Sequence, residues 1–110
     1  MENGELADLG LRAFHGGDFT SAIAYLSDLT KRDASLWHCR LYLAMAYCQV
    51  SQVGNAVQEL KDIAQWCPDR VLREKAMVLL KEMNRQSMDN LKVLQNHSLT
   101  QKRNGKGRKP

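Results

Sequence analysis

The order of apolar residues in this sequence repeats with a fixed period. When the chain is shifted against itself so that Leu9 falls on Leu43, other apolar positions also coincide: Ala13 with Tyr47, Phe19 with Val53, Ala22 with Ala56, Ile23 with Val57 and Leu26 with Leu60. We call the separation between the members of such a pair one repeat period. A fixed period of roughly 20 to 50 residues is typical of repeat architectures, in which each unit buries its apolar face against the next unit. The period therefore predicts two equivalent units that adopt the same secondary structure.

Each unit contains two helical patterns. The sequence predicts helices over about residues 2–14, 19–31, 36–50 and 55–66. Apolar residues follow the i, i+3, i+4, i+7 spacing of one buried face in the second, whereas the third is apolar nearly all round. Gly16 and Gly17 favour the end of the first helix, Asp18 offers an N-cap for the second, and Pro68 ends the fourth. The alternation of period two that marks a strand is absent from the sequence. We expect an all-α protein built from antiparallel helix hairpins.

A unit of this period made of two antiparallel helices resembles the tetratricopeptide repeat, whose length is about 34 residues. The second unit carries that family's residue types at Leu43, Ala44, Tyr47, Ala56, Leu60 and Pro68, and the first carries them at Leu9, Gly10, Ala22 and Leu26. The first unit departs from the pattern with Ala13 at the aromatic site and Ala34 at the proline site, and in the second unit Arg40 occupies the usual tryptophan site. The resemblance covers about residues 3–70 and implies an α-solenoid with a right-handed superhelical twist.

The resemblance and the composition together divide the chain. We expect a repeat domain over residues 1–96, followed by a disordered basic tail over residues 97–110 that lacks large apolar residues except for Leu99. Within the domain, the first repeat spans about 3–36, the second about 37–70, a capping helix about 69–86, and a further amphipathic segment 87–96. The capping interpretation depends on Glu74 and Lys81, which stand where the earlier units have core or aromatic residues.

Charge and hydropathy exclude several classes of protein. Residues 1–69 carry a net charge of −4, whereas residues 70–110 carry +8, so the two halves are not expected to bind the same kind of partner. The longest strongly apolar run, residues 41–48, is far shorter than a membrane span. The acidic residues near the start do not fit a signal peptide. We therefore expect no membrane span and a cytoplasmic location.

No combination of residues in the sequence points to catalysis. The histidines His15, His38 and His97 fall on three separate segments, the three cysteines form no CxxC pair, and no phosphate-binding or nucleophile motif occurs. We expect a protein that is not an enzyme and that binds neither a metal nor a cofactor.

The first helix of each hairpin lines a concave groove in the family that this chain resembles. Carried over by register, the resemblance places these residues in the groove: Gly4, Ala7, Leu11, Phe14, His38, Leu41, Met45 and Cys48. The positions that clamp a peptide's terminal carboxylate in the family are here Ala7, Leu11, Tyr42, Leu72 and Ala76, so no carboxylate clamp is expected. The groove is apolar and suits an apolar or helical partner segment. The implied function is that of a protein-interaction module or adaptor.

Three occupants of that apolar face remain open. The chain's own segment 88–96 could cover it, a second copy of the chain could cover it in a homodimer, or a protein or peptide partner could dock there. An alternative function is association with a nucleic acid or another polyanion through the basic residues Lys102, Arg103, Lys106, Arg108 and Lys109. Residues 70–110 contain no Phe, Tyr or Trp on which a base could stack.

Overall fold

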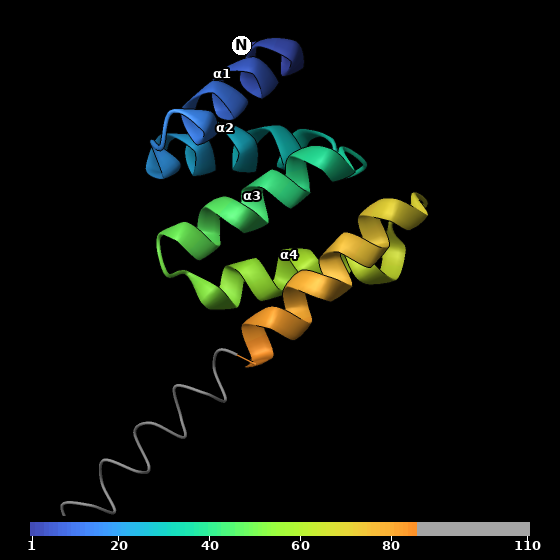
Figure 1. Cartoon of the computed structure of the whole chain (residues 1–110). Helices are drawn as coiled ribbons and strands as arrows, with labels where there is room; N and C mark the ends of the chain where they lie inside the picture. The colour runs from blue at the N-terminus through green and yellow to red at the C-terminus, as the bar shows by residue number, and fades with distance from the viewer. Residues whose placement is uncertain (86–110) are drawn as a thin grey trace, which may run out of the picture. The chain divides into compact units, whose positions relative to one another are not determined.

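A computed structural model describes residues 1–85 of the chain (Figure 1). The helices are α1 (Asn3–His15), α2 (Phe19–Arg32), α3 (Trp37–Gln49) and α4 (Val53–Trp66), and residues 70–85 are also helical. No strand occurs among these residues, which confirms the all-α prediction for them. The amphipathic segment expected at 87–96, the basic tail at 97–110 and the five tail residues proposed to bind a polyanion lie outside the described residues.

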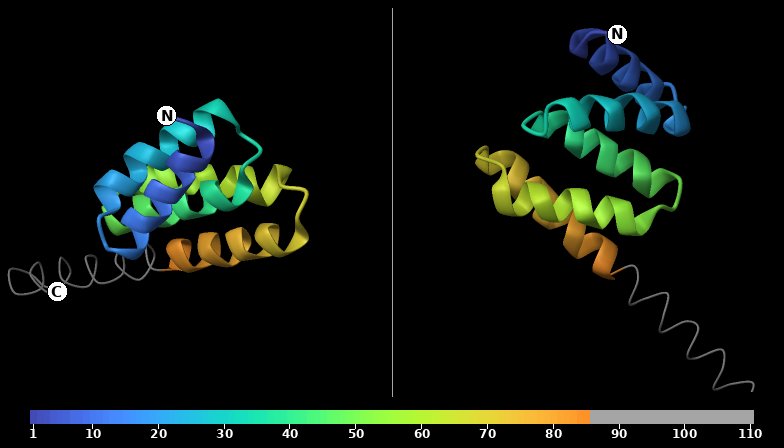
Figure 2. Two further views of the ribbon diagram at one scale, coloured as in Figure 1. Left: turned by 90° about the horizontal axis from the view of Figure 1, so that it is seen from above. Right: turned by 180° about the vertical axis from the view of Figure 1, so that it is seen from behind.

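Residues 1–80 form one compact unit in which consecutive helices pack against each other. Figure 2 shows α1 to α4 running in alternating directions, so that α1 and α2 form one antiparallel hairpin and α3 and α4 form another. The lengths agree as well, because α1 and α3 have 13 residues each and α2 and α4 have 14 each. Within residues 1–85, no helix is both long enough and apolar enough to cross a membrane.

The turns within the two hairpins are built from the same backbone hydrogen bonds. Gly17 has φ 82° and Ser51, one repeat period later, has φ 64°, so each turn contains one left-handed residue. Each turn then closes with a bond from the next amide back over five residues, from Asp18 N to Ala13 O at 2.8 Å and from Gln52 N to Tyr47 O at 2.9 Å. This geometry satisfies carbonyl groups that a helix end would otherwise leave unpaired. Glycine adopts it without strain, whereas the exposed Ser51 is held there by the backbone hydrogen bonds of its turn.

The core of each hairpin occupies equivalent positions. The side chains that are at most 1% exposed include three pairs separated by one repeat period: Ala22 and Ala56, Leu26 and Leu60, and Leu29 and Ile63. Gly10 is buried on α1, and a Cβ atom added there would lie 2.6 Å from Cδ2 of Leu26. The corresponding residue of the second hairpin, Ala44, is fully buried with its Cβ in place. Both hairpins therefore depend on a small residue where their helices cross.

Candidate functional site

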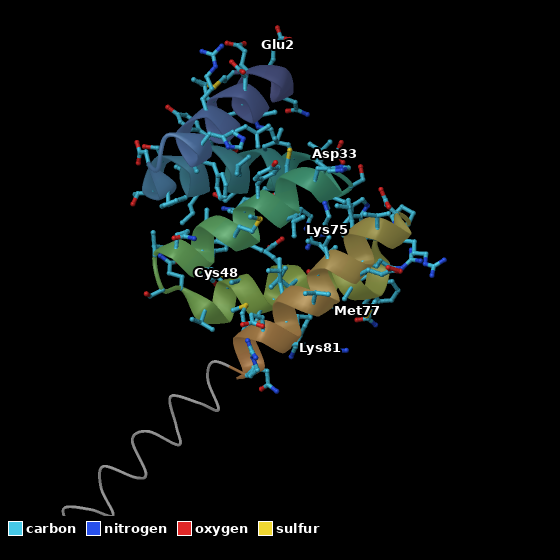
Figure 3. The ribbon with its side chains drawn as sticks, viewed as in Figure 1. Glu2, Asp33, Cys48, Lys75, Met77 and Lys81 are labelled. Atoms are coloured by element: carbon cyan, nitrogen blue, oxygen red, sulfur yellow. The ribbon has the colours of Figure 1, made fainter. Side chains whose placement is uncertain are left out.

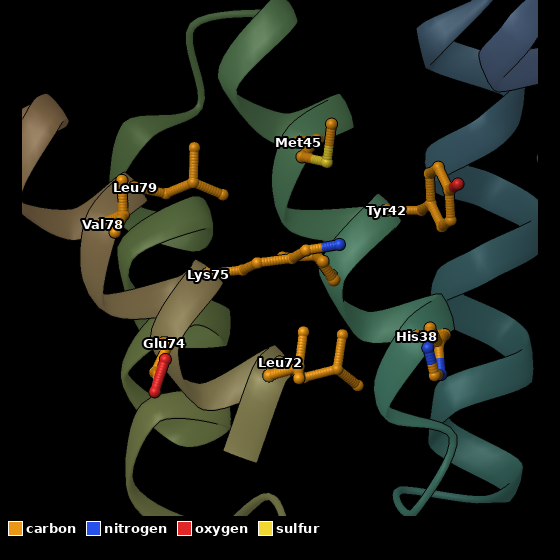
Figure 4. A pocket seen from close by; sticks show the side chains of 10 residues that line it. His38, Tyr42, Met45, Leu72, Glu74, Lys75, Val78 and Leu79 are labelled. Carbon is orange, nitrogen blue, oxygen red and sulfur yellow. The ribbon is translucent and has the colours of Figure 1, made fainter. Parts of the chain in front are cut away.

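A hollow of about 560 Å³ lies between α3 and the helix that starts at residue 70 (Figure 4). Four residues of α3 and six of the later helix line it: His38, Leu41, Tyr42, Met45, Val71, Leu72, Glu74, Lys75, Val78 and Leu79. We call this hollow the α3 groove. Its volume is within the range of roughly 300–1,000 Å³ that is usual for ligand and peptide pockets.

The lining follows from helical spacing. His38, Leu41, Tyr42 and Met45 stand at i, i+3, i+4 and i+7, so they share one face of α3. This helix is apolar on nearly all sides, which allows one face to pack in the core while another remains available. On the other wall, residues 71, 75 and 78 form one such row and residues 72 and 79 form the row beside it.

The floor of the α3 groove is buried and its rim is exposed. Leu41 and Leu72 are buried beneath it, whereas Val71 is 60% exposed and Val78 is 64% exposed. A soluble helix normally turns its large apolar residues inward, so two valines on one rim form an unpartnered apolar surface. Met77 is also exposed, but it does not line the groove.

The charged residues of the lining are Glu74 and Lys75. Glu74 accepts a hydrogen bond at 3.0 Å from Nε of Arg70 on its own helix, so its charge is already partnered. Figure 4 shows the Lys75 side chain extending from its helix across the hollow toward α3. Among the described residues, no ion pair to Lys75 is formed. The charge presented inside the groove is therefore positive.

A smaller hollow of about 270 Å³ shares His38 and Leu72 with the α3 groove. Its other lining residues come from the turn before α3, from the first turn of α3 and from the residue before the later helix: Ser35, Leu36, Trp37, Cys39 and Asp69. The Asp69 carboxylate accepts a hydrogen bond at 2.8 Å from the backbone amide of Val71. That acidic group therefore acts as a local cap for its own helix.

An aromatic cluster lies between α1 and α3. The ring of Phe14 meets the ring of Tyr42 at 5.1 Å between centroids and that of Phe19 at 5.4 Å, both edge to face. His15 also contacts Tyr42, at 5.9 Å. Edge-to-face packing of this kind contributes about 0.5–1.5 kcal/mol per pair beyond the area buried. The rings of Phe14 and Tyr42 therefore join these two helices by packing.

The structure places the residues that the sequence assigned to the groove in three locations. His38, Leu41 and Met45 are brought together in the α3 groove, Ala7 and Phe14 pack against the core from α1, and neither Leu11 nor the exposed Cys48 lines the groove. Tyr42 and Leu72, which the resemblance placed at clamp positions, also line it, but the rest of the other wall was not identified: Val71, Glu74, Lys75, Val78 and Leu79. The sequence feature that indicates this wall is the apolar stripe of the helix after Pro68, a helix that the sequence predicts to be a capping helix.

Arg40 makes the least exposed ion pairs among the described residues. Its Nε lies 2.9 Å from Glu59 Oε1, its Nη2 lies 2.7 Å from Asp62 Oδ2, and its guanidinium carbon lies 4.9 Å above the centre of the Trp37 ring. Burial lowers the pKa of Arg40, but the hydrogen bonds and charges of the two carboxylates outweigh that effect and raise it above its ordinary value. Through these two carboxylates the Arg40 side chain joins α3 to α4.

The cysteines offer no activated nucleophile in the described part of the chain. Burial raises the pKa of both Cys39 and Cys48, which keeps the two thiols protonated at neutral pH. Cys67 is only 2% exposed. Within residues 1–85, no group of three or more His, Cys, Asp or Glu side chains is placed to hold a metal ion. Comparison of the chain with protein-family profiles, with curated proteins and with solved structures found no match.

Proposed function

We propose that this chain is a protein-interaction module without enzymatic activity, and that the α3 groove docks an apolar helical segment of another protein. The observation that carries the proposal is the pair of exposed valines, Val71 and Val78, above a buried apolar floor. We further propose that the module acts as an adaptor in the cytoplasm.

We also propose that the two hairpins are tetratricopeptide-like repeats of a right-handed α-solenoid. The helix bounds support this, because α3 and α4 begin and end one repeat period after α1 and α2. The equivalent turn bonds and buried pairs support it further. In a solenoid, each unit buries the face of its neighbour, so the last helix is expected to keep one face for a further element. The helix over 70–80 stands in that position in the sequence.

The dimensions of the α3 groove suit a short helical anchor. Residues 71–79 rise by about 12 Å along their helix, which corresponds to about two helical turns of a partner. An amphipathic helix of this length presents apolar side chains at i, i+3, i+4 and i+7 along one face. Burying them against Val71, Val78 and Met45 would remove apolar surface from water on both molecules, at about 25 cal/mol per Å².

The test is a selection that depends on the groove. A phage-displayed library of amphipathic helical peptides is passed over the full chain and over the double variant Val71→Glu/Val78→Glu, and recovered peptides are measured by fluorescence anisotropy. Both valines are solvent-exposed, so the double variant is expected to fold. We expect peptides whose affinity falls at least tenfold in the double variant. Met77→Glu is the matched control, because Met77 is 42% exposed on the same helix but does not line the groove, and it should leave the affinity unchanged.

Three outcomes contradict this proposal. If no recovered peptide distinguishes the full chain from the double variant, the groove does not dock helices. If the full chain sediments as a dimer that the double variant breaks, the occupant is a second copy instead. If peptides bind only after residues 87–110 are removed, the chain's own C-terminal segment is the occupant.

A further inference from the structure

We infer that the docked helix carries an acidic side chain that pairs with Lys75 at the middle of its apolar face. This inference rests on the proposed function and adds the chemistry by which a partner is recognised. Its basis is Lys75, a lysine of the lining whose charge no described side chain pairs.

Lys75 stands at the centre of its wall of the groove. Leu72 and Leu79 lie about one helical turn on either side of it, and Val71 and Val78 flank it in the same way along the rim. Figure 4 shows its methylene chain crossing the hollow, with the ammonium group directed toward α3. Figure 3 shows Lys75 and Met77 on different sides of the same helix, as their spacing requires. A helix laid along the groove must therefore pass over the Lys75 ammonium group.

No described side chain neutralises that charge. Glu74, the acidic neighbour in the lining, is paired with Arg70 at 3.0 Å. Asp69 belongs to the smaller hollow and accepts the backbone amide of Val71. The facing wall, formed by α3, contributes His38, Leu41, Tyr42 and Met45, and none of these is an acidic residue. A partner carboxylate placed beside Lys75 would be balanced, whereas an incoming cation would meet a like charge.

Docking of a helix would bury the unpaired positive charge of Lys75, so this charge affects which helices bind. A partner that covers Lys75 with apolar side chains would remove water from the ammonium group without providing a hydrogen-bond acceptor. Burying an unpaired charge in this way weakens binding. A Glu or Asp on the partner restores a charge-assisted hydrogen bond, and a Lys or Arg there is rejected by repulsion. Because apolar lining lies one turn to each side, the recognised pattern is apolar, acidic, apolar at successive helical turns. Lys75 thus determines which apolar helices are accepted and in which register.

The test uses the same peptide library and reads the sequences of the groove-dependent peptides. With the full chain, we expect Asp and Glu to be enriched at the central position of the apolar face. With Lys75→Glu, the enrichment should change to Lys and Arg, and with Lys75→Met, which keeps the methylene stem, it should disappear. For one selected peptide, replacing the central Glu with Lys should weaken binding to the full chain about tenfold and strengthen binding to the Lys75→Glu variant.

The control removes the effect of net charge. Lys61 is exposed on α4 and lines neither hollow, so Lys61→Glu alters the net charge as Lys75→Glu does without touching the groove. It should leave the acidic enrichment intact. If the enrichment survives in Lys75→Glu, or if the central Glu-to-Lys change has the same effect on every variant, Lys75 does not select the partner. Groove-dependent peptides without any charge preference would overturn this inference alone, whereas the absence of groove-dependent peptides would overturn the proposed function itself.

Discussion

Leu6 on α1 and Arg40 on α3 occupy equivalent places in the two hairpins, one repeat period apart, yet their chemistry is opposite. Leu6 is 3% exposed and belongs to an apolar cluster that also includes Tyr25. The Arg40 side chain is 12% exposed and forms ion pairs with Glu59 and Asp62 on α4. Glu59 stands one repeat period after Tyr25, so the two hairpins differ at both positions, with apolar or aromatic residues in the first and charged residues in the second.

The difference shows that the backbone of a hairpin does not require one kind of contact between its helices. An apolar contact is stabilised by the area it buries and tolerates exchange for another apolar side chain of similar size. An ion pair of low exposure depends on every member being present, because removing one leaves the others with unpaired charge. The second hairpin should therefore be the more sensitive of the two to single substitutions at this contact.

Giving the second hairpin the residue of the first is expected to have the largest effect. Arg40→Leu should lower the free energy of unfolding by about 2 kcal/mol, because Glu59 and Asp62 lose the guanidinium that pairs with both of them. The loss stays below that of a fully buried pair, since the carboxylate side chains remain 21% and 32% exposed. Urea denaturation followed by far-ultraviolet circular dichroism measures it.

The double variant Arg40→Leu/Glu59→Tyr completes the exchange and should recover about half of that loss, since Asp62 still receives a hydrogen bond at 3.2 Å from Gln58. Arg12→Leu is the control, because Arg12 pairs with Asp8 on the exposed side of α1, and it should change stability by less than about 0.5 kcal/mol. If Arg40→Leu alone were as stable as the unaltered chain, the stability of the second hairpin would not depend on the ion pairs of Arg40. The two hairpins would then be equally tolerant of substitution at this contact.

The helix crossing gives the next largest effect. In an open helix, Gly→Ala stabilises by roughly 0.5–1 kcal/mol. At Gly10 the sign should reverse, with a net loss of about 1 kcal/mol, because the new Cβ would lie 2.6 Å from the buried Leu26 side chain. The opposite change in the second hairpin, Ala44→Gly, should also destabilise, by about 1 kcal/mol, because that hairpin accommodates a Cβ there. Thermal unfolding of Gly10→Ala and Ala44→Gly measures both changes in stability.

Gly4→Ala provides the control for the glycine series, since nothing lies within 4 Å of a Cβ added at Gly4. It should be neutral or slightly stabilising. Should Gly10→Ala stabilise the chain as Gly4→Ala does, then α1 and α2 can separate at no cost, and the close approach in the first hairpin would not be a constraint.

Some features of these two hairpins could be predicted from the sequence and others could not. The helices could be predicted within about two residues, because the period of apolar residues, the Gly16–Gly17 pair and Pro68 are local signals. The left-handed conformation of Ser51 could not be predicted, since serine does not favour positive φ and no residue type in this turn indicates it. Likewise, the helical pattern assigns Glu59 and Asp62 to solvent, because it carries no information about an arginine on the facing helix.

The α3 groove was only half predictable for a related reason. The resemblance placed His38, Leu41 and Met45 in the groove, and helical spacing puts these three residues on one face of α3. Whether that face is covered or hollow depends on the distance to the next helix, which the side chains of both walls determine together. Phe14 on α1 is covered by its edge-to-face contact with Tyr42, whereas Tyr42, Leu41 and Met45 on α3 border a hollow.

The helix caps provide the smallest and most selective comparison. Asp18 accepts a hydrogen bond at 3.2 Å from the amide of Ser21 and caps α2, whereas Gln52, at the equivalent position before α4, makes no side-chain cap bond. Gln52→Asp should therefore raise the free energy of unfolding by about 0.5–1 kcal/mol at neutral pH. Differential scanning calorimetry would detect this as a higher melting temperature. A variant that melts no higher would mean that the turn at Ser51 prevents residue 52 from reaching the amides of α4.

The same comparison predicts a pH dependence. The hydrogen bonds with Ser21, first through its side chain and then through its backbone, lower the pKa of Asp18 below its ordinary value. A carboxyl group whose pKa is lower in the folded state stabilises the fold at pH values above its unfolded pKa of about 3.9, and that contribution is lost as the pH falls through the folded-state pKa. The stability difference between the unaltered chain and Asp18→Asn should thus shrink on acidification below about pH 4.

Gln52→Asp should lose its gain in stability over the same pH range, whereas Gln52→Asn, a cap without a titrating group, should keep its gain. Asp33, whose pKa is lowered by Ser35, is present in all these variants and cancels from the differences. Equal acid sensitivity in the Asp and Asn variants at residue 52 would show that the new cap does not act through a carboxylate.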